Sequence, residues 1–283
     1  MDSSRAETPV AGLPGALREH RTRHHLSQLD LALRAGTTQR HLSFIESGRS
    51  VPGRTMVVRL GESLELSPRD LNELLLSAGY APVLPESSLD GPELAPVRTA
   101  IDHLLRGHMP YPALVVDRAG TLIAANPAVG LITEGAAPEL VGPGSNVYRL
   151  ALHPDGLAPR VRNLAEWARH ILARLGHQAD LRAELAAYVP EPGPSAGVLG
   201  FAVPLRLRSR FGDLCLMTTV TTFATAVDVT LSELKLEAFL PADAATAEAL
   251  SAAAAETAAA TSVEAGGGAV PEVSRGRRAP GRR

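Results

Sequence analysis

Several features that mark other classes of protein are scarce or missing in these 283 residues. Cys215 is the only cysteine, so no disulfide can form within the chain. No apolar run is long enough to cross a bilayer, and residues 1–15 lack the apolar core of a signal peptide. Neither a Walker loop nor a dinucleotide fingerprint is present. We therefore expect a cytoplasmic protein with no membrane association and no cofactor.

The overall charge of the chain does not indicate a nucleic-acid partner, because the chain has 28 basic and 30 acidic residues and a formal net charge of −2. Lys235 is the only lysine, so nearly all positive charge is arginine. Between residues 18 and 59, eight arginines stand against three acidic residues, which gives a local charge of +5. Such a cluster can neutralise phosphates, so we expect salt-dependent affinity for DNA here.

The same basic segment has the pattern of two short helices joined by a tight turn. Ser27 and Asp30 form a capping box that begins the first helix. Gly36 can adopt the left-handed conformation that ends this helix. Thr37 or Thr38 can cap the second helix. The first helix is expected at residues 28–34, and the second is expected to end near residue 45.

The periodicity of these two helices separates an inner face from an outer face. The inner face of the second helix should hold Leu42 and Ile45. Outward glutamine and arginine at a helix start suit contacts with base edges, because each can bond one base in two places. The alternative is a plain helical core with solvated polar residues. The inward partners on the first helix would be Leu29, Leu31 and Ala32, and the outward residues would be Gln39, Arg40, Ser43 and Phe44.

The segment GTTQRHLSFIESGR at residues 36–49 resembles the Cro/CI-type (XRE) helix-turn-helix repressors. This resemblance implies that Gln28 contacts a phosphate, that Gln39 and Arg40 contact bases, and that Arg54 enters the minor groove. Phe44 departs from the phage repressors, where a polar residue stands, although its ring could meet a thymine methyl group. The residues expected at the DNA interface are Gln28, Thr38, Gln39, Arg40, Ser43, Phe44, Arg49 and Arg54.

The same resemblance implies a structural ion pair. Arg21 and Glu46 resemble a partly buried pair that ties the first helix of such domains to the third. The partners implied are a double-stranded DNA operator and a second copy of the chain, since half-sites on DNA are related by a two-fold axis.

The length leaves room for two domains, each with its own core. A five-helix DNA-binding domain should span residues 13–80, with further helices at 54–64 and from Pro68 to about Ala78. Residues 81–92 are proline-rich and suit a semi-rigid linker, or else an extended strap packed on one domain. A second domain would span 93–246. Residues 247–283 begin with a frayed alanine-rich helix and are expected to be disordered from about Val263.

The second half alternates between helical and strand patterns. The tripeptide Arg118-Ala119-Gly120 is a hairpin signal between two strands. We expect an α+β domain with an antiparallel sheet that helices cover on one face. The expected helices are 93–105, 160–175 and 180–188, and the expected strands are 113–117, 121–125, 197–208, 213–223 and 233–240.

This half resembles the ligand-binding domain of the MmyB-like transcription regulators, which has a PAS-like fold. The matching stretches are MPYPALVVDRAG at 109–120, LALHPDGLAPRVRNLAEWAR at 150–169 and TVTTFATAVDVTLSELKLEAFLPADAAT at 219–246. Together with the repressor-like half, the resemblance covers about residues 13–246. It implies a bacterial regulator with a pocket for a fatty-acid-like ligand.

Such a pocket needs an apolar tunnel with one or two polar groups at its mouth. The same faces can instead form plain core, Asn126 can cap the next helix, and His153 can belong to a turn. The lining candidates are Leu164, Trp167, Ile171, Val203, Leu205, Leu216 and Phe223. The head-group candidates are Asn126, His153, Arg160, Asn163 and Arg206.

No catalytic or metal site is expected. Ser195 fits the G-x-S-x-G pattern of hydrolase nucleophiles, but it lies in a proline-rich loop before a strand rather than between a strand and a helix. His20, His24 and His25 lack the multi-ligand spacing of a zinc site. We therefore predict a DNA-binding transcriptional regulator whose second domain senses a fatty-acid-like molecule. The alternatives are a second domain that serves only dimerisation or protein interaction, and an acyl hydrolase that uses Ser195.

Overall fold

The computed structural model describes residues 12–176, 178–189, 203–223 and 226–266. The chain forms two compact units. The first contains the described residues up to 101 together with 221–235, and the second contains residues 102–220 and those from 236 onward. Within the described ranges, no helix is long and apolar enough to cross a membrane.

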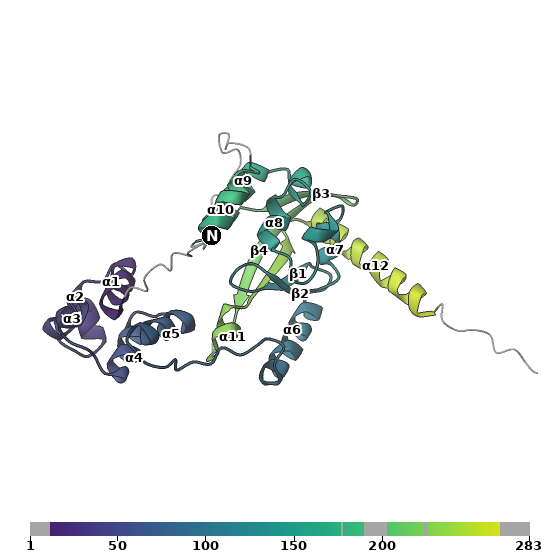
Figure 1. The fold of residues 1–283 in the computed structure, drawn as a ribbon. Coiled ribbons are helices and arrows are strands. Elements are labelled where there is room, and N and C mark those ends of the chain that lie inside the picture. Colours follow the sequence, from purple (N-terminus) through teal and green to yellow (C-terminus); the bar gives the residue numbers. More distant parts are fainter. Residues whose placement is uncertain (1–11, 177, 190–202, 224–225, 267–283) are drawn as a thin grey trace, which may run out of the picture. The chain divides into compact units, whose positions relative to one another are not determined.

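Five helices precede the proline-rich segment in the first unit, as the sequence predicted (Figure 1). Leu29 is nevertheless 48% exposed, so its predicted place in the core is wrong. Residues two positions apart on a helix point to different sides, and α2 buries Leu31 instead. The helices are α1 (Leu13–Arg23), α2 (Gln28–Arg34), α3 (Gln39–Glu46), α4 (Arg54–Ser63) and α5 (Pro68–Ser77).

The predicted caps and turn of the helix pair are present. The Ser27 hydroxyl accepts a hydrogen bond from the Asp30 amide, and the Asp30 carboxylate accepts one from the Ser27 amide, so the capping box is complete. Thr38 caps α3 by accepting from the His41 amide. Gly36 adopts φ +60°, a conformation that a glycine tolerates without strain.

The proline-rich segment 81–92, which we call the strap, is held by α5. The buried Asn72 donates to the Leu84 carbonyl at 2.8 Å. Its side-chain oxygen accepts from the Val83 and Leu84 amides at 3.0 and 3.2 Å. One side chain therefore satisfies three backbone groups, and this part of the segment has the packed form rather than that of a free linker.

A short helix that the sequence pattern did not predict, α11 (Val229–Glu233), completes the first unit. Asp228 caps α11 by accepting from the Leu231 amide at 3.1 Å. The Asp228 carboxylate also accepts from the Ser87 amide at 3.0 Å, and the Val229 amide donates to the Pro85 carbonyl at 2.8 Å. Residues 83 and 84 of the strap thus contact α5, and residues 85 and 87 contact α11 and its cap.

The second unit is built on a five-stranded antiparallel sheet with strand order β2-β1-β5-β4-β3. The predicted first hairpin is present, and Gly120 in its turn has φ +83°. Along β3, Leu205 and Leu207 are buried while Arg206 and Arg208 are exposed, so one face of this strand is covered. The strands are β1 (Ala113–Val116), β2 (Leu122–Ala125), β3 (Leu205–Ser209), β4 (Gly212–Thr222) and β5 (Lys235–Pro241).

Helices supply the rest of the buried cluster of the second unit. The predicted helices are present, and two short ones between β2 and α9 were not predicted. Asn146 begins the second of these by accepting from the Tyr148 and Arg149 amides. The α-helices from residue 95 to residue 186 are α6 (Ala95–Gly107), of which residues 95–101 belong to the first unit, α7 (Val129–Thr133), α8 (Val147–Leu152), α9 (Leu164–Arg174) and α10 (Ala179–Ala186). The 3-10 turns are Pro92–Leu94 in the first unit, and Pro138–Leu140 and Ala158–Arg160 in the second.

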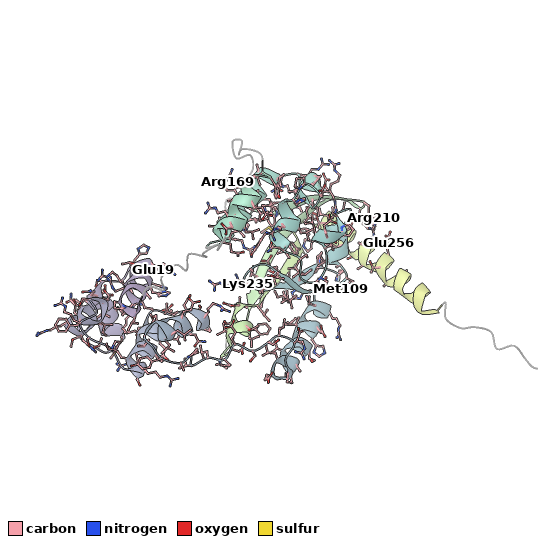
Figure 2. All side chains as sticks on the ribbon, viewed as in Figure 1. Glu19, Met109, Arg169, Arg210, Lys235 and Glu256 are labelled. Carbon is pink, nitrogen blue, oxygen red and sulfur yellow. The ribbon has the colours of Figure 1, made fainter. Side chains whose placement is uncertain are left out.

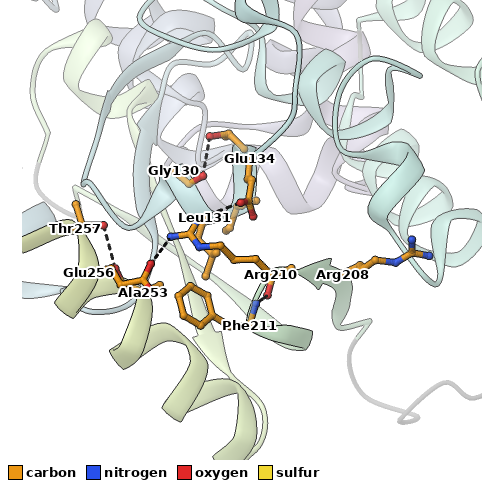
Figure 3. A network of polar contacts seen from close by, with 12 residues as sticks. Gly130, Leu131, Glu134, Arg208, Arg210, Phe211, Ala253, Glu256 and Thr257 are labelled. Atoms are coloured by element: carbon orange, nitrogen blue, oxygen red, sulfur yellow. Dashed lines mark hydrogen bonds and ion pairs between the residues drawn. The ribbon is translucent and has the colours of Figure 1, made fainter. Parts of the chain in front are cut away.

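The alanine-rich helix α12 (Ala244–Gly266) packs on the second unit through Leu250 and Ala253. Arg210, in the turn between β3 and β4, contributes to this packing. Its guanidinium donates to Glu134 at 3.0 Å and to Glu256 on α12 at 3.1 Å (Figure 3). Helix α12 extends to Gly266, and residues 267–283, where the tail was expected to be disordered, lie outside the described part.

Candidate DNA interface and interior cavity

The start of α3 presents polar side chains to solvent. Thr38 is occupied as the helix cap, while Gln39 and Arg40 in the first turn are exposed. Leu42 and Ile45 on the opposite side are completely buried, as predicted. The helix is therefore fixed by its apolar face and leaves its first-turn donors available for a partner.

Phe44 connects two arginines on this surface. The guanidinium carbon of Arg40 lies 5.4 Å from the centre of the Phe44 ring, and that of Arg49 lies 5.1 Å from it. Both distances allow cation–π attraction. Arg49 also donates to the Ser47 hydroxyl at 3.0 Å, which restrains its side chain further. The half-buried aromatic residue thus holds two positive charges along one face of α3.

An ion pair joins α1 to α3, as the repressor resemblance implied. Arg21 donates to both carboxylate oxygens of Glu46, at 2.7 and 3.0 Å, and the Glu46 side chain has no solvent exposure. Gln28 adds a third bond to this carboxylate at 2.8 Å. Burial alone would raise the pKa of Glu46, but the bonds from Arg21 and Gln28 outweigh it and lower the pKa.

The remaining predicted DNA contacts surround this helix. Gln28 is half-buried because of its bond to Glu46, and Ser43 is half-buried on α3. Arg49 follows α3 and Arg54 begins α4, and both are exposed. Their contacts with DNA remain predictions.

The second unit encloses a cavity of about 50 Å³, which has room for a few water molecules. Its wall is mainly apolar and comes from the sheet and from α7, α8 and α9. An apolar cavity with few polar groups is the usual form of a small-molecule site. The lining residues are Leu114, Val129, Ile132, Thr133, Val147, Tyr148, Leu150, Ala151, Leu157, Trp167, Ile171, Arg174, Leu205, Glu237 and Phe239.

An ion pair forms part of this otherwise apolar wall. Arg174 at the end of α9 donates to Glu237 on β5, whose side chain is only 7% exposed. Burial, and next the negative charge of Glu237, raise the pKa of Tyr148. Burial, and next the positive charge of Arg174, lower the pKa of His170 on the same helix. The cavity wall therefore carries one positive and one negative charge, and these two charges cancel.

Trp167 lines the same cavity and is 5% exposed. Its indole Nε1 is buried and has no hydrogen-bond partner among the described residues. Leaving a buried N–H donor unpaired costs about 1–3 kcal/mol, so a partner in the cavity would be favoured. Tyr148 lines the cavity as well, and its ring lies beside Gly120 of the β1–β2 turn.

The predicted lining residues are only partly brought together. Trp167, Ile171 and Leu205 line the cavity. The other candidates take different places: Leu164 and Val203 pack against the same core, Leu216 is fully buried within it, and Phe223 belongs to the first compact unit.

The five predicted head-group residues lie away from the cavity wall. Asn126 bonds the backbone of Leu105, Tyr111 and Ala113 and does not cap α7, which begins after Ala128. The other four make further structural contacts or face solvent. Arg160 donates to the backbone carbonyls of residues 131, 132, 134 and 208. Asn163 donates to the Pro204 carbonyl and accepts from the Arg206 amide, His153 accepts from the Asp155 amide, and the Arg206 side chain is exposed.

Sequence reasoning missed Arg174, Glu237 and Tyr148. One signal was available for Glu237, because a carboxylate stands in a strand whose neighbours are apolar and whose positions 236–239 are all buried. Buried charges are normally paired. The identity of the partner could not be predicted, since Arg174 lies 63 positions away along the chain.

Among the described residues, no group of His, Cys, Asp and Glu could hold a metal ion. Ser195 lies outside the described residues, so the structure does not describe the geometry of the alternative hydrolase nucleophile.

Comparisons with known proteins agree with this division of the chain. The family model described as the MmyB-like transcription regulator ligand binding domain matches residues 97–253, and a helix-turn-helix model matches residues 17–71. Among curated proteins, none matches the chain significantly.

Two solved structures are similar to parts of the chain. The restriction-modification controller protein C.AhdI from Aeromonas hydrophila is 30% identical, with 21% of this chain and 86% of that protein covered and a TM-score of 0.20. An RNA-binding Light-Oxygen-Voltage receptor is 16% identical, with 87% of this chain and 63% of that receptor covered and a TM-score of 0.26.

Proposed function

The chain belongs to the MmyB-like transcription regulators, with an XRE-type helix-turn-helix domain before the ligand-binding domain, and from this premise we propose how it recognises DNA and senses its ligand. The helix-turn-helix domain binds a double-stranded operator in the cytoplasm as part of a homodimer. The second domain binds a small molecule with a fatty-acid-like chain, and occupancy of the cavity changes operator affinity.

The surface of α3 supports the DNA half of this proposal. Gln39 and Arg40 are exposed donors at the start of a helix whose other face is fixed in the core. An arginine in this position can bond guanine in two places, and a glutamine can do the same with adenine. Phe44 holds Arg40 and Arg49 beside it, so the charges have a preferred direction before DNA arrives.

The apolar cavity supports the ligand half. A chain of methylene groups would gain about 0.8 kcal/mol for each group transferred from water to such a wall. The space of about 50 Å³ is small, so the surrounding side chains must move to admit an acyl chain. A pocket that widens on binding provides the difference between two states that regulation requires.

A route between the two functions is suggested by α11. Arg69 on α5 donates to both carboxylate oxygens of Glu233 at 2.7 and 2.9 Å, and to Glu86 in the strap at 2.5 Å. The Ser87 amide also donates to the Asp228 carboxylate. Together these bonds attach the connection between β4 and β5 to the DNA-binding helices. We call the contacts of Arg69, Glu86, Ser87, Asp228 and Glu233 the α5–α11 clasp.

The clasp is close along the chain to a residue of the cavity wall. Glu233 ends α11, Lys235 begins β5, and Glu237 of the cavity follows two residues later (Lys235 is labelled in Figure 2). A ligand that displaced Glu237 would therefore displace a strand that continues directly into the clasp. Coupling of this kind requires that the ligand bind the two arrangements with different affinity.

The proposal rests on one observation: the start of α3 exposes the donors Gln39 and Arg40 in a chain that also encloses an apolar cavity. Operator selection from random DNA with the purified full-length chain tests the DNA half. Enrichment of one sequence with two-fold symmetry would support it, and enrichment of no sequence would contradict it. A second domain that serves only interaction would bind DNA in the same assay but would respond to no small molecule.

A further inference from the structure

We propose that the cavity selects a ligand whose polar group is uncharged, such as an amide, an alcohol or a lactone attached to an apolar chain, and that it discriminates against carboxylates. This inference rests on the proposed ligand-sensing function and refines the class of ligand. The Arg174–Glu237 pair provides the discrimination, and the indole N–H of Trp167 provides a hydrogen bond to the neutral group.

The first argument is the balance of charge in the cavity wall. Among the described residues of this wall, Arg174 is the only basic one, and it already has the carboxylate of Glu237 as its partner. The pair spans 63 positions of the chain and connects α9 to β5, so Glu237 can leave Arg174 only together with its strand. A second carboxylate would find no free positive charge in the wall.

The second argument is the environment of that charge. The cavity wall is otherwise built from leucine, isoleucine, valine and aromatic residues, which give an ionised group little solvation. Removing an ion from water without a new partner is costly. A carboxylate would have to bind together with a proton or expel Glu237, and both reduce its affinity. An amide or hydroxyl group avoids this cost.

The third argument is an unpaired donor. The Nε1 atom of Trp167, which lines the cavity, is buried without a partner among the described residues. A carbonyl oxygen is the complementary acceptor for such a donor. An amide in addition offers N–H donors to Glu237, so both members of the ion pair could keep their bond and gain another.

Residues that could have favoured a carboxylate do not contribute to this wall. Arg160 uses its guanidinium for backbone carbonyls of α7 and β3, and Arg206 is on the exposed side of β3. The described part of the cavity therefore offers one paired guanidinium and one buried neutral donor, the indole N–H of Trp167.

Trp167 provides the readout, because it is the only tryptophan of the chain. We would titrate the full-length protein with hexanamide and, separately, with hexanoate at about pH 7, where a free carboxylic acid is ionised. Hexanamide should bind at least tenfold more tightly. It should also shift the Trp167 emission to longer wavelength as the indole N–H gains an acceptor. Equal or tighter binding of hexanoate would overturn the inference.

Substitution of Glu237 gives a sharper test. Glu237→Gln keeps the shape of the side chain but leaves Arg174 as an unpaired positive charge, so the preference should reverse and hexanoate should bind more tightly than hexanamide. The exposed Glu248 on α12 offers a matched control, and Glu248→Gln should retain the native preference. Continued preference of Glu237→Gln for hexanamide would contradict the role of the pair.

A double variant covers the case in which an unpaired Arg174 prevents folding. Arg174→Gln with Glu237→Gln removes both charges, and this variant should again prefer hexanamide. A preference of the double variant for hexanoate would overturn the inference. If hexanoate alone bound to the native protein, this inference would fail while ligand sensing would stand. If neither compound changed the Trp167 emission, ligand sensing by this cavity would fail together with the inference.

Discussion

Glu233 and Glu237 lie four residues apart, and each closes an ion pair in a different compact unit. Glu233 pairs with Arg69 of α5 at 2.7 Å, and Glu237 pairs with Arg174 of α9. The start of β5 is therefore the shortest path along the chain from the cavity wall to the DNA-binding helices. A segment that is held by an ion pair at each end, as residues 233–237 are, can transmit a ligand-induced movement from one pair to the other.

Loss of the Arg69–Glu233 pair should uncouple the two domains. In Glu233→Gln, hexanamide should change operator affinity by less than twofold, because the ion pair that joins α11 directly to α5 is lost. Fluorescence anisotropy of labelled operator DNA, with and without hexanamide, measures this change. The control is Arg106→Ala, which removes an exposed pair with Asp102 at 3.9 Å. A response of Glu233→Gln equal to that of the control would refute the role of the clasp.

Arg40→Ala should relax specificity at one base position of the operator and cost about 1–3 kcal/mol in binding. The reason is loss of a base-edge contact rather than of general charge. Competition among operators that differ at single positions measures the effect, and Arg106→Ala again serves as the control for a lost positive charge. Uniform weakening over all sequences would assign Arg40 to the phosphates instead.

Glu46→Ala should lower the free energy of unfolding of the helix-turn-helix domain by about 3 kcal/mol, because it leaves Arg21 without its buried partner. Urea unfolding measures this loss. The matched control is Glu19→Gln, whose exposed pair with Arg23 should contribute less than about 0.5 kcal/mol. Losses of equal size in the two variants would contradict the structural role of the Arg21–Glu46 pair.

The same carboxylate sets the direction of a pH effect. The pKa of Glu46 is lower in the folded state than in the unfolded chain, where it is ordinary. Its contribution to stability is therefore complete above the ordinary carboxyl pKa and is lost as the pH falls through the lower folded value. Unfolding followed over this acidic range should show a steeper loss for the native chain than for Glu46→Gln. Parallel curves would contradict the shift.

Gly36→Ala should destabilise the helix pair by about 1–2 kcal/mol, because φ +60° is unfavourable for a residue with a Cβ atom. That atom would also lie 2.3 Å from Nη2 of Arg59, which would have to move. Gly53→Ala is the matched control, since no atom lies within 4 Å of its added Cβ. Thermal unfolding compares the two, and equal melting temperatures would show that the turn tolerates alanine.

The parts of the fold that the sequence predicted well are those set by local chemistry. Ser27 with Asp30, Gly36 and Gly120 mark helix starts and turns through their own backbone preferences, and all were predicted correctly. Leu29 was misplaced because a helix of seven residues offers too few positions to define its buried face.

The parts that could not be predicted depend on contacts between distant residues. Helix α11 has only five residues, and its Asp228 cap also binds Ser87, 141 positions earlier. The Arg174–Glu237 pair likewise becomes visible only when α9 and β5 meet. For the ligand site, the sequence therefore predicted some of the apolar wall but not the polar groups within it.

The central claim is that one chain couples a small molecule in the cavity to DNA. The most direct measurement is the affinity of the full-length protein for its selected operator, determined with and without saturating hexanamide. The account predicts a change of at least about fivefold, the lower end of typical coupling between two sites. An unchanged affinity, with hexanamide demonstrably bound at Trp167, would contradict it.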